Sequence, residues 1–275
     1  MILNCRGKLV DLECPKVMGV LNCTPDSFYD GGKYEGRSME AQIEKMIDEG
    51  VDIIDVGGMS SKPGAEIISA EDEIARVTPA LKYINSVHSD AIISIDTLHS
   101  KVATVALDHG VHMINDISGG EYDKNLVRVS IENNIPYIMM HMQGKPSNMQ
   151  DAPTYDDVVL DILKAFNVKI SKYRSEGLKD IVIDPGFGFG KTVKHNYDLL
   201  AGLSTFRITK CPLLVGVSRK SMLYKPLGID PQKALNATSA AHMIALQNGA
   251  NILRVHDVKE AKQCVKIFQM SNGIF

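Results

Sequence analysis

The sequence predicts an α/β protein: a (β/α)8 TIM barrel with an N-terminal β-hairpin, in a single domain over residues 1–275. Three observations predict this fold. Eight short apolar runs recur along the chain, segments with helical spacing separate them, and several of these segments end at a glycine. Runs that are apolar throughout, rather than alternating, are typical of parallel strands buried on both faces. Barrels of this class occupy about 250 residues as one domain, which suits the length of this chain.

The first residues, ILNCRGKLVDLE, alternate in part around Arg6 and Gly7 and predict a small hairpin over the bottom of the barrel. The eight strands follow it. In chain order they are KVMGVLN from Lys16, VDIIDVGG from Val51, AIISIDT from Ala91, VHMINDIS from Val111, PYIMMHM from Pro136, DIVIDPG from Asp180, PLLVGVS from Pro212 and NILRVHD from Asn251.

Helical spacing separates the strands. Ile74, Val77, Leu81 and Ile84 fall on one face of a helix, and Ser69, followed three places later by an Asp, gives that helix a capping-box-like start. A glycine can take the left-handed conformation that stops a helix. Repeated βα units allow either a barrel or an open doubly wound sheet, and a count of eight strands favours the barrel. Glycines stand just before four strands: Gly50, Gly110, Gly177 and Gly249.

The composition is that of a soluble globular protein, with 44% hydrophobic and 23% charged residues. The net charge of −3 gives no electrostatic reason to expect a nucleic-acid partner. The five cysteines are scattered without metal-like spacing, so we interpret them as reduced thiols. We find no signal peptide and no apolar run of membrane-spanning length, and therefore expect a cytoplasmic protein that does not enter a membrane.

Polar residues gather where the predicted strands end, which is the end of a barrel that carries its active site. One Asp or Asn after a strand is usually a turn former, but eight polar endings together predict a functional site. In chain order these residues are Asn22, Asp55, Asp96, Asn115 with Asp116, His141, Asp184, Ser218 with Arg219 and Lys220, and Arg254 with His256.

The chemistry of these residues indicates two kinds of contact. Asp96, Asn115 and Asp184 suit the donor-rich edge of an amino-substituted heterocycle, because a carboxylate can accept two parallel N–H bonds. Lys220, Arg254 and His256 are cations or hydrogen-bond donors that suit an anionic group. The site is therefore expected to bind a polar ring that carries an anionic tail.

Two long loops, NCTPDSFYDGGKYEG after the first strand and GGMSSKPGAE after the second, mix hydroxyls, glycines and a cation. Such loops can fold over a substrate and present backbone N–H groups to a phosphate. Neither loop matches the Walker pattern. DPGFGFGKT does not place its glycines as GxGxxG, which excludes a dinucleotide-binding interpretation.

Taken together, these stretches resemble the dihydropteroate synthase family from about Val17 to Val258. The most specific motifs are TPDSF followed by DGG, DPGFGFGKT, and SRKS. The resemblance implies a transferase of folate biosynthesis that condenses (7,8-dihydropterin-6-yl)methyl diphosphate with p-aminobenzoate, releasing pyrophosphate and requiring Mg²⁺. It also implies two small-molecule substrates, a homodimer and a sulfonamide target.

The resemblance also assigns roles to residues. Asp96, Asn115, Asp184 and Lys220 would hold the pterin; Asn22 would ligate Mg²⁺; and Arg254, His256 and Asn22 would surround the diphosphate. Phe28, Ser61, Pro63, Lys220 and Ser221 would frame the p-aminobenzoate, with Phe189 and Arg219 nearby. The catalytic set would be Asp96, Asp184, Lys220, Arg254 and His256.

One loop departs from the family pattern: Ser61 and Lys62 stand where the family commonly has Thr and Arg. Lysine keeps the charge but loses the planar fork that binds phosphate with two parallel hydrogen bonds. We expect the loop to work with weaker pyrophosphate binding.

Two other functions are compatible with a pterin pocket. A methyltransferase domain for reduced folates would not need the TPDSF and SSKPG loops or the anion site at Arg254 and His256. A noncatalytic pterin-binding barrel would not need the whole set of catalytic candidates. The intact set favours the synthase.

Overall fold

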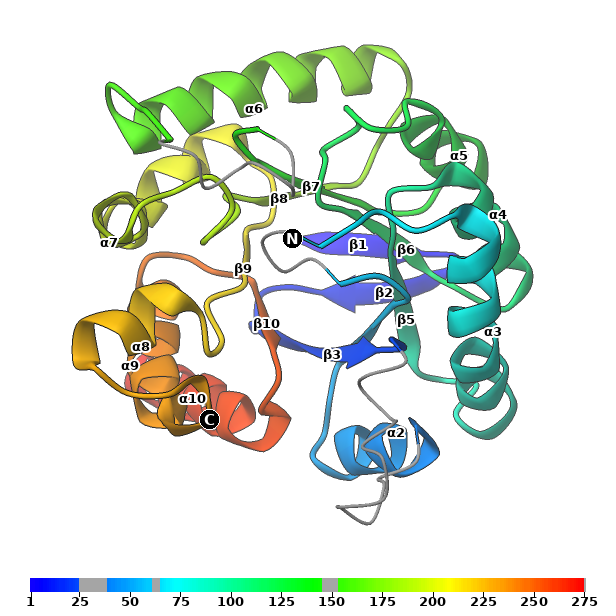
Figure 1. Ribbon diagram of the computed structural model, residues 1–275, viewed down its shortest axis with the longest axis horizontal. Helices are drawn as coiled ribbons and strands as arrows, with labels where there is room; N and C mark the ends of the chain where they lie inside the picture. The colour runs from blue at the N-terminus through cyan, green and yellow to red at the C-terminus, as the bar shows by residue number, and fades with distance from the viewer. Residues whose placement is uncertain (25–38, 61–64, 145–152, 275) are drawn as a thin grey trace.

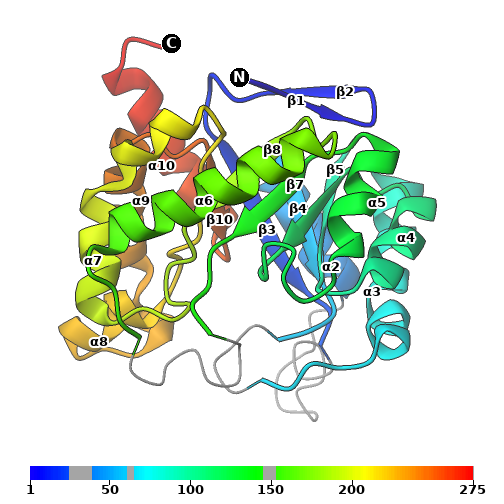
Figure 2. The same ribbon diagram turned by 90° about the horizontal axis from the view of Figure 1, so that it is seen from above.

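The computed structural model describes residues 1–24, 39–60, 65–144 and 153–274. Eight parallel strands form the wall of a barrel, and helices cover its outer surface (Figure 1). A separate two-stranded hairpin lies across one end of the barrel (Figure 2). The structure confirms the predicted barrel and its hairpin.

The strands and helices alternate along the chain after the hairpin. The strands are β1 (Ile2–Cys5), β2 (Lys8–Asp11), β3 (Lys16–Asn22), β4 (Ile53–Gly57), β5 (Ile92–Asp96), β6 (Met113–Asp116), β7 (Tyr137–Met140), β8 (Ile181–Asp184), β9 (Leu214–Val215) and β10 (Ile252–Val255). The α-helices are α2 (Met39–Asp48), α3 (Ala70–Val87), α4 (Ser100–Asp108), α5 (Asn125–Asn133), α6 (Val158–Ser175), α7 (Val193–Ala201), α8 (Ser221–Leu227), α9 (Leu235–Gln247) and α10 (Val258–Ser271). Two short 3-10 helices complete the fold, η1 (Leu203–Thr209) and η2 (Pro231–Lys233).

The barrel closes where β8 meets β9. The hydrogen-bonded order of the sheet runs β8-β7-β6-β5-β4-β3-β10-β9, and an isolated parallel bridge between Ile183 and Leu213 joins its two ends. Ile183 N also donates to Pro212 O at 2.9 Å. This closure excludes the open doubly wound sheet.

Strand β9 is shorter than its apolar run predicts. The run from Pro212 to Ser218 holds only two ladder residues. Near the start of this run, the Asn251 side-chain oxygen accepts the Leu213 N–H at 2.9 Å. A side chain therefore takes the place of a backbone acceptor from a neighbouring strand.

The hairpin closes the bottom of the barrel. Arg6 and Gly7, with φ of 54° and 89°, make its two-residue turn, as the right-handed twist of antiparallel strands favours. Leu3 and Cys5 are buried in one cluster with the inward side chains that begin the barrel strands. The hairpin therefore seals the apolar end and leaves the other end for chemistry.

Helix boundaries follow the sequence signals. Ser69 caps α3 by accepting the Asp72 N–H at 3.1 Å, as predicted. The predicted glycine stops are confirmed, since all four take positive φ between a helix and the next strand: Gly50, Gly110, Gly177 and Gly249.

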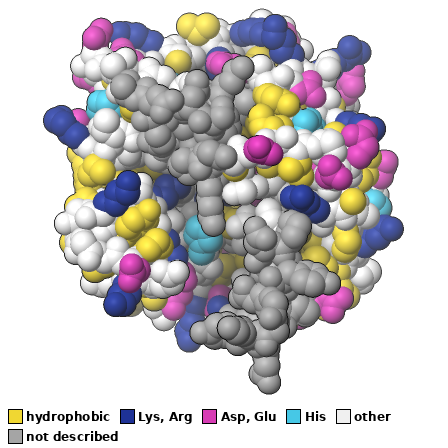
Figure 3. Space-filling model, in the orientation of Figure 1, with side chains coloured by type: hydrophobic (Ala, Val, Ile, Leu, Met, Phe, Trp, Pro, Cys, Tyr) yellow, Lys and Arg dark blue, Asp and Glu magenta, His cyan; other side chains and the backbone are white. Residues whose placement is uncertain are grey.

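The surface carries charges of both signs. Figure 3 shows Lys and Arg side chains interspersed with Asp and Glu around the edge of the face it displays. In the described parts of the chain, no helix is long and apolar enough to cross a bilayer. The expected absence of a nucleic-acid partner stays a prediction.

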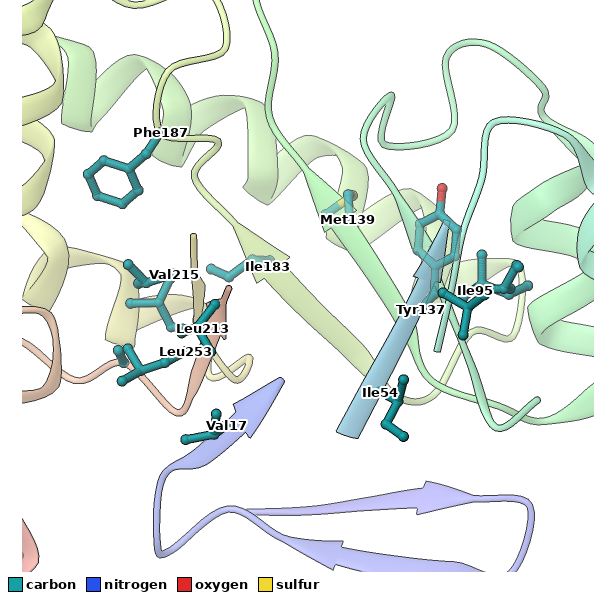
Figure 4. Close-up of a cluster of buried hydrophobic side chains, with 14 of the residues drawn as sticks. Val17, Ile54, Ile95, Tyr137, Met139, Ile183, Phe187, Leu213, Val215 and Leu253 are labelled. Carbon is teal, nitrogen blue, oxygen red and sulfur yellow. The ribbon is translucent and has the colours of Figure 1, made fainter. Parts of the chain in front are cut away.

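Alternation along the strands separates two apolar layers. Outward side chains such as Ile54, Ile95 and Leu253 pack beneath the helices (Figure 4). Inward side chains at the starts of the strands fill the bottom of the barrel, because successive residues of a strand point to opposite faces. The inward set is Met18, Ile53, Ile92, Met113, Ile138, Val182, Leu214 and Ile252.

This bottom layer should contribute strongly to stability. Ile138 is 0% exposed, so Ile138→Ala is expected to lower the free energy of unfolding by about 2–5 kcal/mol. Leu9→Ala is the control, because Leu9 is 70% exposed in the hairpin and its loss should change stability by about 0.5 kcal/mol or less. Urea unfolding measures both values. Equal losses would contradict a packed barrel interior.

Candidate active site

The barrel interior becomes polar above the bottom layer. On β4, β5, β6, β8 and β10, the next inward residue above the apolar layer is polar. In chain order these residues are Asp55, Ser94, Asn115, Asp184 and Arg254. Asp96 and Asn22 follow two residues beyond the inward positions of β5 and β3, at the carboxyl ends of these strands. The predicted gathering of polar groups at one end is therefore present.

Arg254 joins two carboxylates inside the barrel. Its Nε donates to Asp55 Oδ2 at 2.7 Å, and its Nη2 donates to Asp96 Oδ2 at 2.6 Å. Asn115 Nδ2 donates to the same Asp55 oxygen at 3.0 Å. Groups on four strands that are far apart in sequence thus form one hydrogen-bonded cluster, which we call the Arg254 cluster.

Asp55 is a member of this cluster to which the sequence analysis gave no role. It is fully buried, and its Oδ1 has no hydrogen-bond partner among the described residues. The signal was its place in IIDVGG, at an inward position near the end of a strand.

The cluster holds more negative than positive charge. Burial raises the pKa of Asp96 to about 7, although the nearby Arg254 opposes the rise. Burial acts to lower the pKa of Arg254, but the attraction of Asp55 and Asp96 outweighs it and raises that pKa. Arg254 therefore stays charged, while Asp96 can gain interaction energy from further N–H donors.

Asp184 and Lys220 are oppositely charged groups whose electrostatic attraction affects the pKa of each. Asp184 ends β8, is buried, and accepts the Gly186 N–H at 2.8 Å. Burial raises its pKa, and the positive charge of Lys220 opposes this rise. Burial in turn lowers the pKa of Lys220 to about 8, against the attraction of Asp184.

Lys220 also contacts the loop after β8. Its Nζ donates to Phe187 O and lies 4.8 Å from the centre of the Phe189 ring, within the range of a cation–π contact. Phe189 itself packs with Leu98 and Met140 at the mouth of the barrel. An aromatic surface thus borders the polar site.

The side chain of Arg219 is tied to the protein. Its Nε and Nη2 donate to the two oxygens of Asp257 at 2.8 and 2.9 Å, and its Nη1 donates to Pro231 O and Gln232 O. This pair joins the start of α8 to the segment after β10. Ser221, the first residue of α8, lies two places further along the chain. Substrate contact by Arg219 or Ser221 stays a prediction.

His256 lies just after β10, with its Nδ1 3.1 Å from Ser218 Oγ. Desolvation of the ring and then the charge of Arg254 lower its pKa to about 4. His256 is therefore a neutral hydrogen-bond donor or acceptor at neutral pH before an anion binds, rather than the second cation that the sequence allowed.

Two strand-end residues point elsewhere. Asp116 faces away from the barrel interior, accepts the Tyr137 hydroxyl at 2.5 Å and accepts the Gly120 N–H at 2.8 Å, so it shapes a turn. His141 contacts Lys191. Lys191 belongs to the DPGFGFGKT motif, and no sequence signal predicts its burial. Phe28, Ser61, Lys62 and Pro63 lie outside the described residues.

The residues present fit a magnesium ion held mainly by substrate. Asn22 is exposed at the end of β3 and offers an amide oxygen. Among the described residues, no group of three or more His, Cys, Asp or Glu could hold a metal. Magnesium usually keeps several waters and is bound by one or two protein groups together with substrate phosphates. Asn22 together with substrate phosphates would satisfy this pattern.

Fold and site together define a barrel enzyme whose mouth presents carboxylates, an amide and cations to a polar ring with an anionic group. A family model described as pterin binding enzyme matches residues 18–256. The chain is 41% identical to dihydropteroate synthase of Escherichia coli over 98% of this chain and 96% of that protein. It belongs to the dihydropteroate synthase family.

Solved structures agree with this family. Yersinia pestis dihydropteroate synthase, solved with a sulfonamide drug complex, has 39% identity and a TM-score of 0.92, covering 99% of this chain and 100% of the other. Xanthomonas albilineans dihydropteroate synthase, solved with 4-aminobenzoic acid, has 34% identity and a TM-score of 0.91, covering 100% of this chain and 99% of the other.

The Arg254 cluster should matter for stability without any ligand. Arg254→Met would leave two carboxylates in the barrel without their cation, and at neutral pH we expect a loss of about 3–5 kcal/mol in unfolding free energy. The loss should shrink as pH falls, because Asp96, whose pKa burial raises, then takes up a proton and becomes neutral.

Arg128→Met is the matched control. Arg128 pairs with Glu132 on the surface of α5, where both side chains are mostly exposed, and its loss should cost about 1 kcal/mol or less. Chemical unfolding at two pH values measures both variants. A loss for Arg254→Met that equals the control at neutral pH would contradict the role of the cluster.

Proposed function

We propose that this chain condenses (7,8-dihydropterin-6-yl)methyl diphosphate with p-aminobenzoate, giving 7,8-dihydropteroate and pyrophosphate. The observation that carries the proposal is the inward-facing set of Asp96, Asn115, Asp184 and Lys220 at one end of the barrel. The near full-length similarity to dihydropteroate synthases supports it.

Binding of the pterin follows from the charge of the site. The amino-substituted edge of a pterin carries adjacent N–H donors, and a carboxylate can accept two of them in parallel. Asp184 suits this role because it is buried and its pKa is raised, so new donors to its charged form add stabilisation. Asn115 can add an amide contact, while Lys220 can donate to a ring acceptor.

The diphosphate would lie toward the mouth, near His256 and Asn22, with the positive charge of Arg254 below it. Ser218 holds Nδ1 of His256, which leaves Nε2 for the anion. An anion next to the imidazole favours its protonated form. His256 can therefore take up a proton when the diphosphate binds and supply a second positive charge.

The reaction breaks the C–O bond to the diphosphate and forms a C–N bond to the arylamine, whose extra proton is then released. Positive charge develops on the methylene carbon and the pterin ring as the C–O bond breaks. Asp96 and Asp184 can stabilise that charge, and Arg254 and His256 can stabilise the departing anion. Asn22 and the diphosphate would hold Mg²⁺, which would supply charge neutralisation for the leaving group.

The p-aminobenzoate would lie beside Phe189, Lys220 and Ser221, with Phe28, Ser61 and Pro63 completing its surroundings, while Lys62 would act on the pyrophosphate. Sulfonamides resemble p-aminobenzoate and are expected to compete at this position. We further propose that the enzyme works in the cytoplasm as a homodimer.

The direct test is pyrophosphate release by purified protein given the dihydropterin diphosphate and Mg²⁺, with and without p-aminobenzoate. We expect release that depends on p-aminobenzoate and yields 7,8-dihydropteroate. Tight pterin binding without release would instead support a noncatalytic pterin-binding barrel.

Asp184→Asn tests whether the carboxylate of Asp184 binds the pterin edge, because the substitution keeps the shape of the side chain. The amide keeps the shape but loses one acceptor and the charge, so kcat/KM is expected to fall roughly a hundredfold, as for about 2–3 kcal/mol of lost charge-assisted hydrogen bonding. Asp198→Asn on the surface of α7 is the control and should keep normal turnover. Normal turnover by Asp184→Asn would remove this residue from the mechanism.

A further inference from the structure

A lysine that the proposed mechanism does not use is buried behind the loop that follows β8. Lys191 is only 3% exposed. Its Nζ donates to Gly186 O at 2.8 Å and to Phe189 O at 2.9 Å, and lies 3.4 Å from His141 O. Lysine is rarely buried without a paired charge, and here backbone carbonyls surround the ammonium group.

The loop around Lys191 has little room to take another shape. Gly186, Gly188 and Gly190 have φ of 72°, 84° and 61°, which side chains rarely adopt. A Cβ atom at Gly186 would lie 2.0 Å from His141 O. The loop is therefore pressed against the segment after β7, with two of its carbonyls turned toward the Lys191 ammonium.

A second lysine holds the same loop from the other side. Phe187 O accepts a hydrogen bond from Lys220, and the Phe189 ring lies 4.8 Å from Lys220 Nζ. The carbonyls of Gly186 and Phe189 thus face Lys191, while the Phe187 carbonyl faces Lys220. Consecutive peptide planes are linked along the chain. Fixing the Gly186 and Phe189 carbonyls therefore also restricts the direction of the Phe187 carbonyl.

We propose that Lys191 is a positioning residue: its ammonium group holds the loop after β8 so that Phe189 can form the arylamine side of the site. This inference rests on the proposed function. The pterin side should depend on Lys191 much less, because Asp184 belongs to β8 and is fixed by pairing between β7 and β8.

Lys191→Met removes the donors while keeping a side chain of similar length. We expect the KM for p-aminobenzoate to rise at least tenfold. Binding of 6-hydroxymethyl-7,8-dihydropterin, measured by calorimetry, should change less than threefold. Lys194→Met is the control, since Lys194 is 81% exposed and pairs only with Asp198 in the described structure; it should change neither value.

Other outcomes would overturn the proposal. A merely structural role would lower the active fraction, so kcat would fall while the KM for p-aminobenzoate stayed the same. Pterin affinity that falls as much as the KM rises would also contradict it. If Lys191→Met does not fold, Lys191→Gln still removes the charge and shortens the reach toward the Gly186 and Phe189 carbonyls, so an unchanged KM in that variant would also count against the proposal.

A measurement without catalysis separates this inference from the proposed function. Phe189 N donates to Gly186 O at 3.1 Å, and Gly188 N donates to Asn196 Oδ1 at 2.7 Å. Hydrogen exchange at these two amides should be at least tenfold faster in Lys191→Met than in the wild type. Unchanged exchange would refute the positioning role even if the protein proved to have no synthase activity.

Discussion

The Arg254 guanidinium lies among carboxylates in the interior of the barrel, and the arrangement of the site depends on this placement. Asp55 and Asp96 come from neighbouring strands, and each is joined to Arg254 from a third. A buried carboxylate without a cation would be protonated or would disfavour folding. The pairing with Arg254 therefore allows carboxylates to stay charged inside the barrel, where they can contact a bound heterocyclic ring.

The polar cluster is possible because a dry layer lies beneath it. The hairpin and the first inward side chains of the strands close the bottom of the barrel with apolar contacts. Water is thereby excluded from below, which strengthens electrostatic interactions above. Stability and chemistry are thus divided along the barrel axis, with the bottom supporting the fold and the mouth carrying the charged groups.

Much of this architecture could be predicted from local patterns. Continuous apolar runs revealed the strands, and polar residues at their ends located the site. The pairing of Arg254 with Asp55 could not be predicted, because it joins residues 199 positions apart. The burial of Lys191 also had no local signal, since a lysine after a glycine-rich loop is ordinarily solvated. The outward direction of Asp116 was predictable in principle, because neighbouring residues of a strand face opposite sides.

The wall of the barrel is weakest where β8 meets β9, since a single bridge between Ile183 and Leu213 stands there in place of a full ladder. Fewer backbone hydrogen bonds mean a smaller free energy for local opening. The segments on either side of this seam lead to Asp184 and to Lys220. Local opening at this seam would therefore change the separation of Asp184 and Lys220 before it disrupted any full strand ladder.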